Sequence, residues 1–476
     1  MNEKKLGLPS IIATSAGLII ATSCLLSLGV GSAAIGESFI ISMVIACVLN
    51  ILFALSVSEL NALMPNLTGG LAQYTLACMG PFISIIAMVG GYLVCNTMIS
   101  SAECAMFGNT LNSIFPQFGL SGSVYCVVLL IILIVVNLRG VDMFAKVQNF
   151  VAYGLIFSLL IMGILGTIKI NPSDIVMQPA VLSTNFADIT SYCGLAFFLF
   201  IGCEYAIPIA NKVDNPKRKL PLGMVISLVV ICIMFSLLVI GFKNYTPWDA
   251  LGESTTPHVL YGTALLGPLG TYWMAIVSIF AVVSSVNTII SSLSYIAFGM
   301  AKIGLLPDIF MKVNKKGAPW FGIILFGGTM SVINAAGLST SASLSFLILT
   351  GTVFWMIAYI ITHINVLILR KRLPKAPRAF KVPGGPVIPI VGSIGILWMI
   401  WNISSDSATR LSIYGVSLLI LVALVIYAAV WTKKSMKRDL FTPYAVEDVM
   451  AMENELYPVY NNPKTGASKV HPVMEK

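Results

Sequence analysis

The chain has 476 residues, of which 57% are hydrophobic and only 10% are charged, and its formal net charge is +9. This composition excludes an ordinary soluble domain and is typical of a polytopic membrane protein. The positive charge requires no nucleic-acid partner, because basic cytoplasmic loops that face anionic lipid headgroups account for it.

Apolar stretches long enough to cross a bilayer fill most of the chain. A spanning helix needs roughly 20 apolar residues, and the sequence predicts twelve such helices, at 8–31, 38–62, 82–108, 121–138, 146–168, 188–211, 222–243, 268–300, 320–338, 343–369, 386–404 and 411–432. With both termini in the cytoplasm, 25 of the 28 Lys and Arg residues lie on the inner side. The positive-inside rule therefore predicts cytoplasmic termini in an inner or plasma membrane.

The first and sixth of these stretches carry small and polar residues at mid-depth. The interruptions are Ala21-Thr22-Ser23-Cys24 and Ile201-Gly202-Cys203-Glu204. Paired interruptions in two halves indicate an inverted-repeat transporter with its substrate site at the midplane. Close helix packing through small residues is the alternative interpretation.

Two carboxyl side chains, those of Glu103 and Glu204, fall well inside predicted spans. A charge at the bilayer centre costs at least about 2.5–3.5 kcal/mol, so each must be compensated or neutral. Glu204 is predicted to exchange a proton, because its charged form is costly in the bilayer, or else to join two helices by a hydrogen bond. Glu103 is predicted to face an outward vestibule that favours cations, or to make a similar interhelical bond.

Cysteine and histidine usage predicts no metal site and no cofactor. The nine cysteines contain no CxxC pair, and the three histidines are far apart in the sequence. The cysteines are therefore expected to be reduced packing residues.

Four motifs, in this order, resemble the amino acid–polyamine–organocation family of transporters. They are segments 64–81, 200–218, 304–317 and 380–386. The resemblance implies an all-helical membrane protein with the LeuT-type 5+5 inverted repeat, in which helices 1 and 6 are discontinuous. It implies a transporter domain over residues 1–432, with helices 11 and 12 peripheral, and a cytoplasmic tail over 433–476. The tail from residue 441 is polar and is expected to be a flexible appendage.

The same resemblance implies a substrate site at the two interruptions. Ala21, Thr22 and Ser23 occupy the place of a glycine-containing segment whose amides bind the substrate carboxylate. Ala21 and Ser23 replace glycines, so either the helix breaks differently or the hydroxyl groups share the recognition. The pocket is expected to include residues from four helices: Ala21, Thr22, Ser23, Cys95, Ile99, Phe198, Ile201, Gly202 and Ile289.

Within helix six, Gly202 matches the family's break and Phe198 matches an aromatic gate. Ordinary packing is the alternative for Phe198. In helix eight, Ile289 stands where the arginine/agmatine antiporter has a tryptophan, which suggests a pocket less suited to a guanidinium group. Glu204, Glu103 and Phe198 are the predicted coupling and gating residues.

Helix five lacks a charge that many proton-coupled members carry. Leu155 aligns with their lysine, and this absence favours amino acid exchange over proton coupling. A coupling proton carried by Glu204 stays the alternative.

The sequence therefore predicts a secondary active transporter of amino acids, acting as a monomer or homodimer in lipid. A carrier of small organic amines or polyamines is the runner-up. A membrane enzyme is not supported, because no hydrolase or phosphate-loop motif is present. A nutrient receptor is the third class considered.

Overall fold

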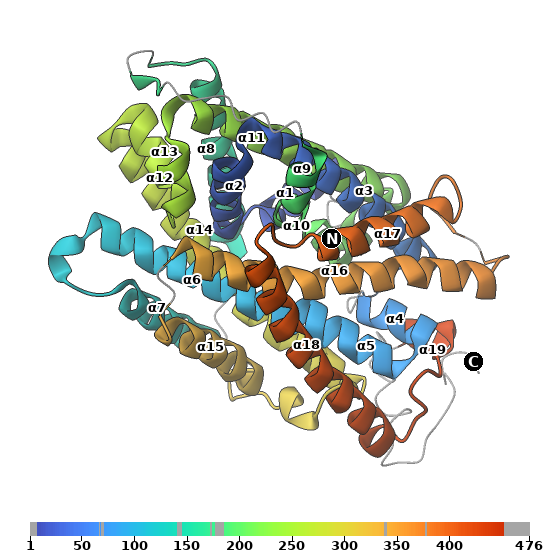
Figure 1. Ribbon diagram of the computed structural model, residues 1–476. Helices are drawn as coiled ribbons and strands as arrows, with labels where there is room; N and C mark the ends of the chain where they lie inside the picture. The colour runs from blue at the N-terminus through green and yellow to red at the C-terminus, as the bar shows by residue number, and fades with distance from the viewer. Residues whose placement is uncertain are drawn as a thin grey trace.

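The computed structural model describes residues 7–451, except 66, 68–70, 140–144, 172–173, 177–184, 338–339 and 377. The described residues are almost entirely helical, and the helices pack into one bundle (Figure 1).

The first part of the chain contains the first interruption, which lies between its first two helices. Its helical elements are α1 (Leu8–Ile19), α2 (Thr22–Ile35), α3 (Phe39–Leu63), α4 (Leu71–Met79), α5 (Pro81–Met88), a π-helical turn (Val89–Val94), α6 (Cys95–Ile114), α7 (Gly122–Leu138) and α8 (Ala145–Thr167).

The second part of the chain contains the second interruption. Its helical elements are α9 (Phe186–Ser191), α10 (Cys193–Phe198), a 3-10 segment called η5 (Cys203–Lys212), α11 (Pro216–Tyr245), α12 (Trp248–Glu253), α13 (Pro257–Leu266), α14 (Pro268–Lys302), α15 (Trp320–Ala335) and α16 (Ser341–Arg372). The chain ends with α17 (Val387–Trp401), α18 (Ser407–Val430) and α19 (Val446–Ala451).

Helical residues occupy every one of the twelve predicted stretches. Six described segments are long and apolar enough to cross a membrane by length and composition, and five shorter apolar helices accompany them. The all-helical prediction is confirmed. The exact number of crossings and the inverted repeat stay predictions.

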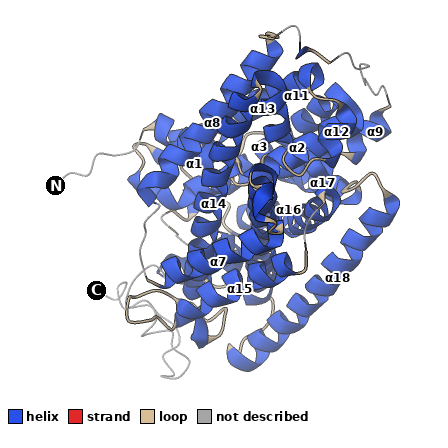
Figure 2. Ribbon diagram, turned by 90° about the vertical axis from the view of Figure 1, so that its left-hand side faces the viewer, coloured by secondary structure: helices blue, strands red, loops and turns tan. Residues whose placement is uncertain are grey.

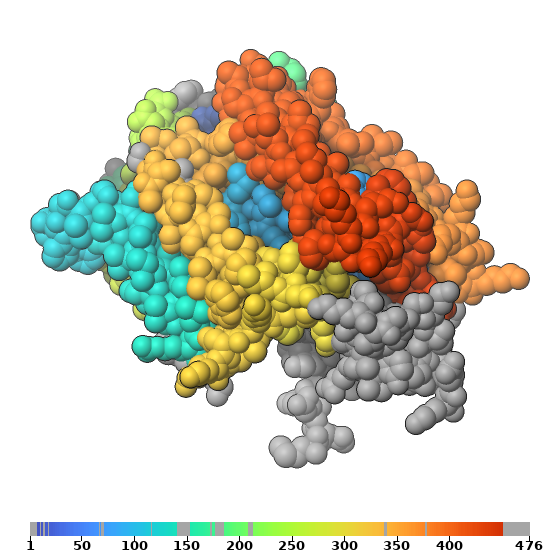
Figure 3. Space-filling view, turned by 90° about the horizontal axis from the view of Figure 1, so that it is seen from below, coloured from blue at the N-terminus to red at the C-terminus, as the bar shows by residue number. Residues whose placement is uncertain are grey.

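The outer surface of the bundle is apolar, as a lipid-facing surface must be. Leu418 and Leu419 on α18 are 60% and 73% exposed, and Ile131 on α7 is 54% exposed. Figure 2 shows α18 as a long helix at the edge of the bundle. In the view from below, α18 and the yellow-to-orange segments near residues 300–350 flank the blue α5–α6 region (Figure 3).

The first membrane stretch is interrupted between α1 and α2. Ile20 and Ala21 are extended, with ψ of 102° and 161° and negative φ. Any L-residue can adopt this conformation. The chain therefore breaks here without a glycine at either position.

The sixth stretch is interrupted differently. α10 ends at Phe198, turns follow, and η5 begins at Cys203. Gly202 has φ of 116°, a conformation that favours glycine strongly. Both interruptions thus lie at the residues that the sequence indicated.

The expectation of a flexible appendage is wrong for residues 441–451. The amide of Tyr444 donates to the carbonyl of Leu76 at 3.1 Å, and the amide of Phe82 donates to the carbonyl of Leu440 at 3.3 Å. Phe441 also packs edge-on against Phe82. This segment is therefore fixed on α4 and α5, while 452–476 lie outside the described residues.

Ion pairs join the C-terminal end of α3 to the end of α16 and the segment after it. Glu59, 2% exposed, accepts from Arg370 Nε at 2.8 Å and Nη2 at 2.5 Å, and from the amide of Val382 at 2.7 Å. Arg378 Nε lies 3.3 Å from the same carboxylate. One carboxylate therefore compensates two guanidinium groups.

Glu59→Ala is expected to destabilise the fold by about 3 kcal/mol, because it leaves two largely buried cations without their counter-ion. The measurement is the apparent melting temperature in detergent. Asp214→Asn is the matched control, since it removes an exposed pair with Lys219 that contributes little. Equal melting temperatures for both variants would contradict the assignment.

Candidate functional site

The two interruptions face one another inside the bundle. α2 packs against α10 and α6, and α1 packs against η5. The hydroxyl of Ser15 on α1 lies 3.5 Å from the carbonyl of Cys203, just after the second interruption. The fold thus brings together the two segments that the sequence singled out.

Glu204 follows Gly202 and lies among three hydrogen-bond donors. Its Oε1 accepts from the Tyr92 hydroxyl at 3.1 Å and from the Trp355 Nε1 at 3.0 Å, and its Oε2 accepts from the Tyr359 hydroxyl at 2.8 Å. The side chain is 6% exposed. These donors compensate a buried carboxylate, as the cost of burial requires.

Tyr359 also connects this carboxyl group to the helix break. Its hydroxyl oxygen accepts from the amide of Gly202 at 3.3 Å while its O–H donates to Glu204. One hydroxyl group therefore links the Glu204 carboxyl group to the amide at the interruption.

The π-helical turn at Val89–Val94 places Tyr92 in this cluster. Gly91 within the turn is close to α16: a Cβ there would lie 2.5 Å from the Cβ of Ala358. This close approach brings Tyr92 next to Trp355, with ring centroids 5.9 Å apart. π-Bulges are frequent at functional sites, and no sequence pattern predicted this one.

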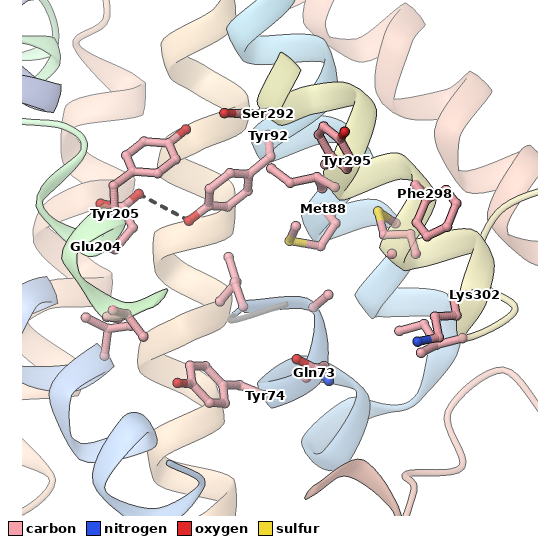
Figure 4. Close-up of a pocket in the computed structure, with 18 of the residues that line it drawn as sticks. Gln73, Tyr74, Met88, Tyr92, Glu204, Tyr205, Ser292, Tyr295, Phe298 and Lys302 are labelled. Atoms are coloured by element: carbon pink, nitrogen blue, oxygen red, sulfur yellow. Dashed lines mark hydrogen bonds between the residues drawn. The ribbon is translucent and has the colours of Figure 1, made fainter. Parts of the chain in front are cut away.

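A cavity of about 530 Å³ opens next to Glu204. Its walls come from α3, α4, the α5–π-turn region, η5 and the C-terminal half of α14. In Figure 4, Tyr92 and Tyr205 lie with Glu204 at one end, and Lys302 lies at the other. The cavity is thus aromatic around one carboxyl group and has a basic side chain at its far end.

The predicted substrate residues lie outside the lining of this cavity. Glu204 is among the residues that line it, and the nine predicted binding residues are not. Thr22, Ser23, Cys95, Ile99, Phe198, Ile201 and Gly202 are buried, while Ala21 and Ile289 are half-buried. Cys95 and Ile99 pack against α16, because a Cβ on Gly351 would lie 3.1 Å from the Cys95 carbonyl and 3.2 Å from Ile99.

Glu103 makes the interhelical bonds that were one of its two predicted roles. Its carboxyl oxygens accept from the hydroxyls of Ser23 at 2.8 Å and Ser285 at 2.7 Å. The group joins α6 to α2 and α14. Leu155, the residue at the missing lysine, is 2% exposed in α8.

Among the described residues, no group of three or more His, Cys, Asp or Glu side chains could hold a metal ion. The cysteines in that part of the chain are free thiols.

The sequence is similar to known transporters over most of its length. A family profile described as amino acid permease matches residues 6–428. The branched-chain amino acid permease of Bacillus subtilis is 25% identical over 450 residues, which cover 89% of this chain and 92% of that protein. The methylthioribose transporter of the same organism is 23% identical over 405 residues, which cover 80% and 83%.

A crystal structure of the manganese transporter of Eremococcus coleocola has a similar fold. It matches with a TM-score of 0.55 and 15% identity, and the alignment covers 90% of this chain and 94% of that one. At this identity the likeness concerns the fold alone.

Proposed function

The chain belongs to the amino acid permease family, and on that premise we propose that it carries amino acids through the membrane by alternating access. Family membership makes it a multi-pass membrane transport protein. The observation that carries the proposal is the pair of facing interruptions, with α2 beginning at one and Gly202 forming the other.

The proposed substrate site lies between these interruptions. The first amides of α2 have no earlier helical turn to bond, so they and the positive end of the helix suit an α-carboxylate. Carbonyl groups freed around Phe198, Ile201 and Gly202 suit the α-ammonium group. This is the arrangement in which an amino acid would bridge the two half-helices.

The walls of the proposed site favour an uncharged side chain. Ile99, Ile201 and Ile289 are aliphatic, and Phe198 ends α10 beside the break. An aliphatic pocket binds apolar substituents and leaves a guanidinium group without acceptors. Leucine-like substrates therefore fit best, in agreement with the named substrates of the Bacillus permease.

The cavity beside Glu204 is proposed to be the path to the cytoplasm. Lys302 and Gln73 line it, and both lie at ends of helices that the positive-inside pattern assigns to the inner face. Cytoplasmic termini belong to the same proposal. Phe198 is then the proposed gate between this path and the substrate.

Exchange is the proposed mode of transport. Leu155 stands in helix five where many proton-coupled members have a lysine. The return of the empty carrier therefore lacks the charge that this lysine supplies in them. Transport driven by a proton on Glu204 is the second mode. Carriage of small organic amines is the alternative substrate class, because carbonyl groups at the second break would accept an ammonium group with or without an adjacent carboxylate.

Purified protein in liposomes preloaded with unlabelled L-leucine is expected to take up labelled L-leucine several-fold faster than empty liposomes. Exchange requires substrate on both sides, which explains the difference. Isopentylamine, which is leucine without its carboxylate, is the matched competitor. Stronger inhibition by the amine than by unlabelled leucine would favour the amine carrier, and no uptake of any of the twenty amino acids would contradict the proposed function.

A further inference from the structure

Glu103 lies where α2 begins. The first residue of α2 is Thr22, and its N-cap is Ala21, whose methyl side chain cannot accept a hydrogen bond from the helix amides. The hydroxyl of Ser23, in the first turn of α2, donates to the Glu103 carboxyl group at 2.8 Å. A carboxyl group from α6 therefore lies beside the first turn of α2, where Ala21 supplies no cap.

This carboxyl group is fixed from a third helix as well. Ser285 on α14 donates to the second oxygen at 2.7 Å, and Glu103 is only 3% exposed. An anion at the N-terminus of a helix is favourable because the amides and the helix dipole both stabilise it. The empty carrier thus already has a carboxyl group at the end of α2.

In the proposed function, the substrate carboxylate binds at the same end of α2 and is a second carboxylate there. Two carboxylates at the same helix end repel one another. We propose that Glu103 is an internal competitor for the substrate carboxylate, so that amino acid binding requires Glu103 to give up its bond to α2. The inference rests on the proposed function and concerns the affinity of the same site.

Two buried hydroxyl groups are available when these bonds rearrange. Thr22 and Ser284 are 1% and 4% exposed, and neither hydroxyl has a partner among the described residues. They adjoin Ser23 and Ser285, the two residues that hold Glu103. A second acceptor entering this region would therefore find unused donors.

Replacing Glu103 by glutamine distinguishes a competitor for the substrate carboxylate from a purely structural link and from a group that attracts the substrate ammonium. The glutamine side chain keeps one carbonyl acceptor for α2 but removes the charge, so the wild-type contacts are largely retained. We expect the dissociation constant for L-leucine to fall by about fivefold or more, as for loss of a charge-assisted bond that competes with substrate. We expect the constant for isopentylamine to stay within about twofold, because this amine has no carboxylate to compete.

The experiment measures equilibrium binding of both compounds to the full-length protein in nanodiscs. Ser285→Ala, which weakens the hold on Glu103, should shift leucine binding in the same direction by a smaller amount. Ser294→Ala is the matched control on α14, since that hydroxyl is buried and donates to the Ile290 carbonyl of its own helix.

Each outcome decides the inference. Unchanged leucine affinity in Glu103→Gln would show a purely structural link between helices, and weaker binding of both compounds would show that Glu103 attracts the ammonium group. Either result would contradict the inference that Glu103 competes with substrate. The proposed function would still stand, because the wild-type protein binds leucine. If the wild-type protein binds none of the twenty amino acids, the proposed function fails first and the inference fails with it.

Discussion

Gly202→Leu is expected to abolish substrate binding and transport while the protein still reaches the membrane. Gly202 has φ of 116°, and a residue with a side chain incurs about 1–3 kcal/mol of backbone strain in such a conformation. The leucine side chain would also add bulk beside the proposed substrate site. Both effects act at the proposed substrate site.

The measurement is uptake of labelled L-leucine into preloaded liposomes, together with stabilisation of the purified protein by leucine. Gly415→Leu on α18 is the matched control, because Gly415 is exposed and a Cβ there would meet no atom within 4 Å. A folded Gly202→Leu protein that leucine still stabilises would place the site elsewhere.

The long elements of this fold could be predicted because hydrophobic length is a strong signal in membrane proteins. A backbone in lipid must satisfy its own hydrogen bonds, so uninterrupted apolar stretches become helices. The two interruptions were also visible, since Ala21-Thr22-Ser23 and Ile201-Gly202 break the apolar pattern. The chain has helix ends at both places.

The partners of the buried carboxyl groups could not be predicted. Trp355 and Tyr359 lie 151 and 155 residues from Glu204 in the sequence, and nothing local connects them. Their meeting depends on the rotation of α16, which the close contact of Gly91 with Ala358 restricts. The π-helical turn was missed for a related reason, because one extra residue in a turn leaves no clear trace in hydrophobic periodicity.

The tail was misjudged because its order comes from contacts with other segments. Residues 441–451 have no sustained helical period, yet Tyr444 bonds the end of α4 through its backbone. Arg438 also lies over the Tyr444 ring at 4.1 Å. The composition of a segment indicates how much apolar surface the segment can bury by itself. It does not show whether another helix provides a surface on which the segment can pack.

Glu204→Ala is expected to cause a large loss of both stability and transport. It removes the acceptor of three buried donors, Tyr92, Trp355 and Tyr359, and each unsatisfied group costs about 1–3 kcal/mol. The cost is greatest for the indole N–H of Trp355, because this group can only donate a hydrogen bond. The check is the apparent melting temperature, measured beside leucine uptake.

Glu204→Gln distinguishes a positioning role from proton coupling. The glutamine carbonyl can still accept from Trp355 and Tyr92, and its NH₂ group can donate to the Tyr359 hydroxyl. The cluster and its link to Gly202 therefore persist, while the group can no longer carry a proton. Under exchange, this variant should take up leucine into preloaded liposomes at a rate within about threefold of wild type, equivalent to less than about 1 kcal/mol.

The decisive comparison uses empty liposomes with an inward proton gradient. An exchanger gains little from the gradient, because no substrate inside returns the carrier. A proton-coupled carrier would accumulate leucine, because the proton on Glu204 would move inward together with the substrate. Strong gradient-driven uptake in the wild type that is lost in Glu204→Gln would therefore refute exchange and identify Glu204 as the coupling residue.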